Sequence, residues 1–242
     1  MAEKGYDIDY YDPRLERESM SEVIEDAKYV VLAVPSMAAP HVLPHLPKDK
    51  PLVVATKGML SDNNFAEFED WMVVSGPGFA DDIKARKETL LTVTDERIKE
   101  LLGVEYIKFD QTNDRLGVLM CGALKNVYAI KAGFDNLKSH PIRLGHYIDE
   151  VCLEMEKILW ANGANPATVS LACGRGDVVL TCSPESRNYE FGYKLRENPA
   201  YKPEKTVEGV TALGKIRRGE IKVPLEETPI MQKLIEMSAA WS

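Results

Sequence analysis

The sequence predicts an α/β sheet domain over residues 1–113 that is followed by an all-helical domain over residues 114–242. Short apolar runs recur in the first part, and several of them end in loops that contain glycine or proline. Helical periodicity replaces this pattern near residue 113, and no flexible linker separates the two parts. With 45% hydrophobic and 28% charged residues, the composition is that of a folded globular protein.

Six segments of the first part are predicted as strands. The run from Tyr29 to Val34 is continuously apolar and is closed by Pro35-Ser36, as is typical of a buried parallel strand. Residues 6–11 alternate in polarity and end at Asp12-Pro13, which indicates a strand followed by a turn. The other strands are expected at 52–55, 72–74, 89–93 and 106–109, and a short acidic helix is expected at 19–27.

The second part is predicted to be helical. Its periodicity extends over residues 114–132 and again over 144–162, where Gly163 can end the helix in a left-handed conformation. The tail is also mostly helical, interrupted by Pro199, Pro203, Pro224 and Pro229.

The beginning of the chain lacks an expected turn. A dinucleotide-binding sheet normally opens with a strand, a G-x-G-x-x-G turn and a helix, and an acidic residue ends its second strand. Here Asp12 ends the first predicted strand, so that turn would precede residue 1, and Gly5 would cap the last turn of the preceding helix. We expect the chain as given to start after the phosphate-binding turn, through a truncated gene model or a rebuilt fold.

Charge and composition exclude several classes of function. The 30 basic and 38 acidic residues give a net charge of -8, which disfavours a general surface for nucleic acid or anionic membrane. No apolar run is long enough to span a membrane. The four cysteines have no C-x-x-C spacing and are expected to be reduced cytosolic thiols, and the four histidines have no metal-binding spacing, so no metal site is predicted.

Lys125 is the only charged residue between positions 116 and 130. Burial of an ammonium group costs several kcal/mol, so this side chain either extends to solvent or faces a polar pocket. Desolvation in such a pocket would lower its pKa toward neutrality, which suits an acid/base role. Asn126 beside it can orient a hydroxyl or a carbonyl group.

A second polar cluster extends from Cys173 to Asn188. Gly-x-Gly-Asp opens it, and Asp177 and Thr181 are four residues apart, so they would share a helix face. Ser186-Arg187-Asn188 offers a hydroxyl, a guanidinium group and an amide for phosphate oxygens. The alternative interpretation is a helix cap followed by a solvated arginine.

Two loops follow predicted buried strands, at the edge where open α/β sheets bind ligands. One contains Lys57 in Ala-Thr-Lys-Gly, and the other is the segment 75–80, Ser-Gly-Pro-Gly-Phe-Ala. Either loop can also be an ordinary connection between a strand and a helix.

Seven motifs occur in an order that is similar to that of the bacterial-type NAD(P)-dependent glycerol-3-phosphate dehydrogenases, from about residue 2 to residue 235. They are Ala-Val-Pro-Ser, Ala-Thr-Lys-Gly, Ser-Gly-Pro-x-Phe-Ala, Gly-Ala-Leu-Lys-Asn-Val-Tyr-Ala-Ile, Gly-x-Gly-Asp-x-x-Leu-Thr-Cys, Ser-Arg-Asn-x-x-Phe-Gly and Val-Glu-Gly. The resemblance implies an incomplete Rossmann-like parallel sheet domain, followed by a helical C-terminal domain like that of 6-phosphogluconate dehydrogenase, with the active site between them.

The resemblance also implies an activity. This is the reversible reduction of dihydroxyacetone phosphate to sn-glycerol 3-phosphate with NAD or NADP as cofactor, by a cytoplasmic homodimer that supplies glycerophospholipid synthesis. Lys125 corresponds to the catalytic acid/base of the family, and Lys57 to a cationic neighbour of substrate and nicotinamide. The family positions that bind substrate are matched by Lys57, Gly76, Lys125, Asn126, Asp177, Thr181, Ser186, Arg187 and Asn188, and those that bind cofactor by Lys57, Ala80, Arg187 and Glu208.

Two other functions fit the same residues. A related lysine-dependent dehydrogenase of 2-hydroxy acids would keep the fold and change the substrate. A non-catalytic protein would keep the helical domain for dimerisation and would have lost cofactor binding.

Overall fold

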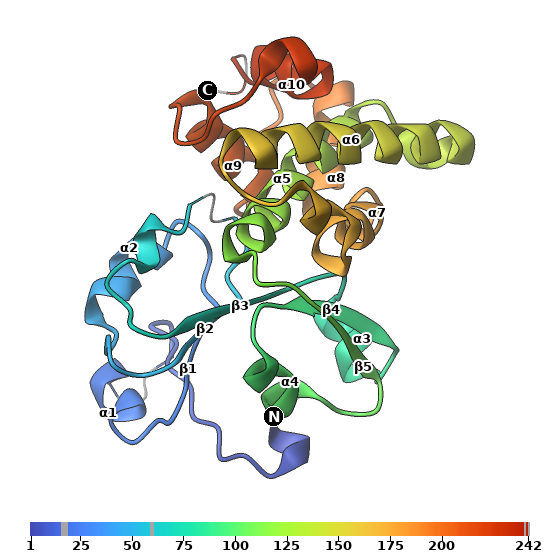
Figure 1. The fold of residues 1–242 in the computed structure, drawn as a ribbon. Coiled ribbons are helices and arrows are strands. Elements are labelled where there is room, and N and C mark those ends of the chain that lie inside the picture. The colour runs from blue at the N-terminus through green and yellow to red at the C-terminus, as the bar shows by residue number, and fades with distance from the viewer. Residues whose placement is uncertain (16–18, 59–60, 240, 242) are drawn as a thin grey trace.

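A computed structural model describes residues 1–15, 19–58, 61–239 and 241. The sheet occupies one half of the molecule, and the helices from α5 onward are gathered in the other half (Figure 1). The two halves meet where the chain leaves the sheet and enters α5 (Arg115–Phe134).

The sheet has five strands in the order β1-β2-β3-β4-β5. These are β1 (Val30–Leu32), β2 (Leu52–Val54), β3 (Trp71–Ser75), β4 (Thr89–Val93) and β5 (Ile107–Gln111). Neighbouring strands are parallel except β3 and β4, which pair antiparallel through Val74 with Val93 and Ser75 with Thr92. The predicted parallel sheet is therefore confirmed as a mostly parallel one. The exception arises because the segment between β3 and β4, which contains α3 (Ala80–Lys84), turns the chain back on itself.

The strand predicted at residues 6–11 is wrong. This segment forms no strand, and the side chains of Tyr6, Ile8 and Tyr10 are exposed. A strand needs a hydrogen-bonding neighbour, and in the described sheet the edge strand β1 pairs only with β2 and the edge strand β5 only with β4. Before this segment, residues Ala2–Lys4 form a single helical turn that ends at Gly5 with a φ of 78°, as predicted for the cap.

The helices of the first half are short. They are α1 (Met20–Glu25), α2 (Ala39–Val42), α3 and α4 (Glu96–Leu102). The Ser19 hydroxyl accepts a hydrogen bond from the Glu22 backbone N–H, and the Glu22 carboxylate accepts one from the Ser19 backbone N–H, so the acidic helix α1 begins with a capping box.

The second half is helical, as predicted. It contains α5, α6 (Pro141–Ala161), α7 (Asp177–Thr181), α8 (Arg187–Glu197), α9 (Glu208–Arg217) and α10 (Pro229–Ser238). Gly163 has a φ of 79° immediately after α6, which confirms its place at the helix end. Among the described residues, no helix is both long enough and apolar enough to cross a membrane.

The helix α5 is the centre of the molecule. Every residue from Gly117 to Gly133 is buried, and the helix contacts β3 as well as α7, α8 and α9. Its Val118 and Met120 belong to the same apolar core as Leu52 and Val73 of the sheet. Because one core includes both halves, the position of α5 is fixed relative to the carboxyl ends of the strands.

Candidate functional site

The site lies where the loops after β2 and β3 approach α5 and α7. Thr56 is the second residue after β2. Its hydroxyl donates to the carbonyl oxygen of Leu32 and accepts from the backbone N–H of Val34. These bonds fix the β2 loop against the end of β1. Lys57 follows directly, and its Nζ donates to the carbonyl oxygen of Gly76 at 3.0 Å. The structure thus brings two of the predicted loops together.

Asp177 binds both lysines of the site. Its Oδ2 forms ion pairs with Lys57 Nζ, at 3.1 Å, and with Lys125 Nζ. The carboxylate side chain is 1% exposed and that of Lys125 is 4% exposed, whereas 34% of the Lys57 side chain is exposed. Lys125 therefore does not extend to solvent. Of the two possibilities that its sequence left open, extension to solvent is excluded, and the amine is buried against the carboxylate of Asp177.

Burial controls the protonation of Lys125. Desolvation lowers the pKa of Lys125 to about 7, because the interior disfavours the ammonium form. The carboxylate of Asp177 opposes this shift, and the positive charge of Lys57 adds to it. The amine can therefore both hold and release a proton near neutral pH, which is the property that a general acid/base needs.

A tight backbone segment presents Asp177. Residues Ala172–Gly176 form a π-helical turn directly before α7. A β-carbon at Gly174 would overlap with the carbonyl oxygen of Val169, so only glycine allows this approach. The turn is also fixed to the sheet, because the backbone N–H of Cys173 donates to Thr92 Oγ1 and that of Ala172 donates to Asp110 Oδ2, each at 2.8 Å.

Thr181 lies one turn after Asp177 on α7, as predicted, and its Oγ1 donates to Asp177 Oδ1 at 3.5 Å. Both side chains are buried. Thr181 therefore supports the carboxylate on the side opposite to the two lysines.

Asn126 and Asn188 bind each other. Asn188 Nδ2 donates to Asn126 Oδ1 at 2.9 Å, and Asn126 Nδ2 donates to the Gly122 carbonyl oxygen at 3.0 Å. The backbone N–H of Gly209 donates to Asn188 Oδ1 at 2.9 Å. These bonds join α5, α8 and α9 directly beside Lys125.

Ser186 and Arg187 differ in their surroundings. Ser186 is the N-cap of α8, and its Oγ accepts from the backbone N–H of Asn188 at 3.3 Å. Arg187 is exposed, and its Nη1 donates to the Thr206 carbonyl oxygen at 3.4 Å. Within the described part of the chain it forms no ion pair. The structure thus shows the cap and the solvated arginine of the alternative interpretation, together with a buried amide at position 188.

Glu208 lies close to the loops after β1 and β2. It is the first residue of α9, and its Oε2 accepts from Ser36 Oγ at 2.7 Å. Lys215, further along α9, donates to the Gly58 carbonyl oxygen at 3.3 Å. Ala80, the remaining predicted residue, is exposed at the start of α3.

Two serines lie beside the predicted site residues although neither was predicted as one of them. Ser36 binds Glu208, and its signal was the Ala-Val-Pro-Ser motif at the end of an apolar strand. Ser75 Oγ is buried and has no hydrogen-bond partner within the described part of the chain. A β-carbon at Gly122 would lie 3.3 Å from this oxygen, so the hydroxyl faces α5 one turn before Lys125 and Asn126.

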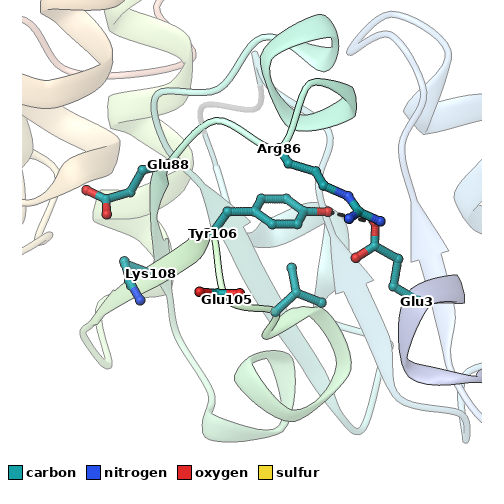
Figure 2. A pocket seen from close by; sticks show the side chains of 7 residues that line it. Glu3, Arg86, Glu88, Glu105, Tyr106 and Lys108 are labelled. Carbon is teal, nitrogen blue, oxygen red and sulfur yellow. Dashed lines mark hydrogen bonds and ion pairs between the residues drawn. The ribbon is translucent and has the colours of Figure 1, made fainter.

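A separate pocket of about 470 Å³ lies at the far side of the sheet half (Figure 2). It is lined by Glu3, Arg86, Glu88, Val104, Glu105, Tyr106 and Lys108. Tyr106 and Arg86 both point toward Glu3: the Tyr106 hydroxyl donates to Glu3 Oε1 at 3.1 Å, and Arg86 Nη2 lies 3.3 Å from the same atom. None of the predicted site residues lines this pocket. The pocket is therefore separate from the residues that the sequence analysis predicted for the site.

The chain is similar in sequence to proteins of known activity. The family model "NAD-dependent glycerol-3-phosphate dehydrogenase C-terminus" matches residues 114–240. The glycerol-3-phosphate dehydrogenase (NAD(P)+) of Pseudomonas syringae pv. tomato is 31% identical over 248 residues, which cover 89% of this chain and 69% of that protein. The corresponding protein of Myxococcus xanthus is 33% identical over 204 residues, and the match covers 60% of its length.

The fold is shared with solved structures. The crystal structure of glycerol-3-phosphate dehydrogenase from Coxiella burnetii matches 92% of this chain with a TM-score of 0.74 at 23% identity. The yeast enzyme matches 90% of the chain, also with a TM-score of 0.74, at 17% identity. The resemblance that the seven motifs indicated is thus confirmed, and the chain belongs to the NAD-dependent glycerol-3-phosphate dehydrogenase family.

Proposed function

We propose that the protein catalyses the reversible, NAD(P)H-dependent reduction of dihydroxyacetone phosphate to sn-glycerol 3-phosphate, in the cytoplasm and for glycerophospholipid synthesis. Membership of the family supports an oxidoreductase of the glycerol-3-phosphate dehydrogenase type. One observation carries the finer proposal: the buried amine of Lys125, with a pKa of about 7, forms an ion pair with Asp177, which is also paired with the partly exposed ammonium group of Lys57.

Lys125 is the proposed acid/base. In the reduction, the C2 carbonyl carbon gains a hydride and its oxygen gains a proton, which the Lys125 ammonium group donates. In the oxidation, the neutral amine removes the proton from the C2 hydroxyl. Asp177 positions the amine through their ion pair, and Lys57 stabilises negative charge on the substrate.

The phosphate group of the substrate would be bound by cations and polar groups at the edge of the site. Arg187 is exposed and has no carboxylate partner within the described part of the chain, so its guanidinium is available to a dianion. Ser186 and Asn188 flank it. Gly76, Asn126 and Thr181 would line the space around the three-carbon chain. Gly76 accepts a hydrogen bond from Lys57, and Thr181 donates one to Asp177. Asn126 follows Lys125 in the sequence and binds Asn188.

The residues proposed to bind NAD or NADP have side chains that are suited to a charged, polar cofactor, and each of them is at least partly exposed. Lys57 and Arg187 offer cations, Glu208 a half-buried carboxylate and Ala80 an exposed helix start. When bound, the nicotinamide supplies the hydride, and the protein supplies orientation and charge.

Lys125→Met tests the proposed acid/base. The variant should lose at least about 100-fold in kcat for dihydroxyacetone phosphate reduction, because proton transfer by a placed side chain contributes factors of that size. Lys131→Met is the matched control, since Lys131 is also a buried lysine of α5 and is paired with Asp135 rather than Asp177. It should retain near-normal kcat.

Three other outcomes would count against the proposal. Near-normal kcat in Lys125→Met would remove the acid/base assignment. Turnover of 2-hydroxy acids without phosphate, and none of dihydroxyacetone phosphate, would replace the substrate class. No turnover together with no change in NADH fluorescence or Tm at millimolar NADH or NADPH would indicate a non-catalytic protein.

A further inference from the structure

Three polar side chains lie in a row across the sheet. Ser75 of β3 pairs with Thr92 of β4, and Thr92 pairs with Asp110 of β5. Paired residues of neighbouring strands have their side chains on the same face of the sheet. This face is turned toward the helical half, because Thr92 Oγ1 accepts from the Cys173 backbone N–H and Asp110 Oδ2 from that of Ala172. We refer to Ser75, Thr92 and Asp110 as the polar row.

Both ends of the polar row have a buried oxygen without a partner. Ser75 Oγ and Asp110 Oδ1 are the only two buried side-chain nitrogen or oxygen atoms that lack a hydrogen bond within the described part of the chain. A buried polar atom without a hydrogen bond destabilises the fold, so such atoms usually bind ordered water or a ligand. Because the two atoms are separated only by the Thr92 hydroxyl, one cause accounts for both.

The spacing of the polar row suits bridging water. The β-carbons of paired residues on neighbouring strands are about 4.5–5.5 Å apart. A water molecule that bonds two oxygens, each at about 2.8 Å, spans a similar distance. The Thr92 hydroxyl accepts one hydrogen bond from Cys173 and can still donate its own proton. Water on either side of Thr92 would therefore give Ser75 Oγ and Asp110 Oδ1 the partners that they need.

The Ser75 end of the polar row lies beside the candidate site. A β-carbon at Gly122 of α5 would be 3.3 Å from Ser75 Oγ, and no other described atom outside its own helix backbone and chain neighbours would be within 4 Å of it. Space for a water molecule thus remains at the buried Gly122, one helical turn before Lys125. At the other end, Asp110 is partly exposed on the edge strand β5. The polar row therefore extends from the edge of the sheet toward the buried amine.

We propose that the polar row binds ordered water and returns protons to Lys125 during turnover, an inference that rests on the acid/base function proposed above. When the Lys125 ammonium group has given its proton to the C2 oxygen, the neutral amine is too deeply buried to take one directly from solvent. Each oxygen of the row then receives a proton on its outer side and releases one on its inner side. Asp110 takes the proton from solvent, and water beside Gly122 passes one from Ser75 to the amine. In the oxidation the same steps occur in reverse.

A crystal structure of the wild-type protein, at a resolution that shows ordered water, tests what the polar row binds. Water should lie within hydrogen-bond distance of Ser75 Oγ and of Asp110 Oδ1. This measurement does not depend on activity. A polar row in which neither oxygen binds water would overturn the proposal, even if the protein reduces dihydroxyacetone phosphate.

Two variants test proton return. Gly122→Ala places a methyl group in the space for water, and Ser75→Ala removes the hydroxyl. Each should lower kcat for dihydroxyacetone phosphate reduction at least about 10-fold, with little change in KM, because proton transfer becomes slow. Ser238→Ala is the matched control, since Ser238 is a buried serine of α10 outside the row. It should keep the wild-type kcat, and circular dichroism should show that all three variants are folded.

Isotope effects separate proton return from a displaced site. In Ser75→Ala and Gly122→Ala, the ratio of kcat in H2O to kcat in D2O should exceed that of the wild type. The effect of deuterium at the transferred position of NADH should not rise, because hydride transfer is not the slowed step. A larger NADH effect in both variants, or near-normal kcat in either, would overturn the relay. If Lys125→Met still loses activity in that case, the proposed acid/base stands, whereas near-normal kcat in Lys125→Met removes the proposed function itself.

Discussion

Asp177 is the only acidic partner of the two lysines among the described residues, so the net charge of this three-residue cluster depends on it. It compensates two ammonium groups, and its own side chain is almost wholly buried. With both lysines protonated, the cluster carries one net positive charge, and with Lys125 deprotonated it is neutral. An anionic ligand that enters beside Lys57 therefore favours the protonated form of Lys125, which is the form that donates a proton.

The lowered pKa of Lys125 predicts how stability depends on pH. An ordinary lysine has a pKa of 10.5, and that of Lys125 is about 7 in the folded protein. Between these values the unfolded chain binds a proton at this amine that the folded protein lacks. The free energy of unfolding should therefore rise with pH in this range, by up to about 1.4 kcal/mol per pH unit for this one group.

Urea unfolding at pH 7.5, 8.25 and 9 measures this slope. The wild type should gain more stability across the range than Lys125→Met, while Lys131→Met should follow the wild type. Equal slopes in the wild type and Lys125→Met would show that the amine keeps an ordinary pKa in the fold.

Among the elements, α8 and α9 approach the backbone of α5 closely, and glycine residues make this approach possible. A β-carbon at Gly192 of α8 would overlap with the carbonyl oxygen of Ile130, and one at Gly209 of α9 would overlap with that of Asn126. Backbone atoms cannot move aside as side chains can. These glycines therefore set the distances at which α8 and α9 pack on α5, and with them the positions of Asn188 and Glu208.

Gly192→Ala should destabilise the protein although alanine is the better helix former. We expect a loss of about 3 kcal/mol, because overpacking at a backbone contact forces the two helices apart. Gly145→Ala is the control, since Gly145 lies in α6 with no atom near the added β-carbon. It should gain about 0.5–1 kcal/mol from helix propensity alone. Chemical unfolding measures both, and a neutral Gly192→Ala would mean that α8 can move away from α5 at no cost.

At the scale of the molecule, the sheet and the helices share one apolar core. Leu52 and Val73 of the sheet belong to the same cluster as Val118 and Met120 of α5. The backbone of the turn before α7 also binds Thr92 and Asp110 of the sheet. Whether the two halves are separate domains, as the composition of the two parts suggested, stays a prediction.

This shared core predicts cooperative unfolding. Amides of β3 and of α8 should lose protection from hydrogen exchange at the same urea concentration, because unfolding one half would expose the α5 surface of the other. Hydrogen exchange with mass spectrometry resolves the two elements. Loss of protection in β3 at a clearly lower urea concentration than in α8 would show two independent units.

The sequence determined most elements because their patterns are local. The apolar runs that became β1, β2 and β3 and the long periodic segments that became α5 and α6 were predicted to within a few residues. The strand predicted at residues 6–11 was wrong, because alternating polarity indicates a strand only where another strand is available to pair with it. The antiparallel step between β3 and β4 left no local signal, since strand direction depends on how the chain returns to the sheet.

By itself, the sequence also determined that a single lysine would sit in an apolar helix and that an aspartate and a threonine would share a helix face. Only the tertiary structure decided that Lys125 is buried, and that its counter-ion is an aspartate it shares with Lys57. The same holds for Arg187, which the fold leaves at the surface, and for Ser75, whose hydroxyl it buries without a partner among the described residues. Burial and pairing depend on segments that are distant in the chain and are brought together by the common core, and no local pattern specifies them.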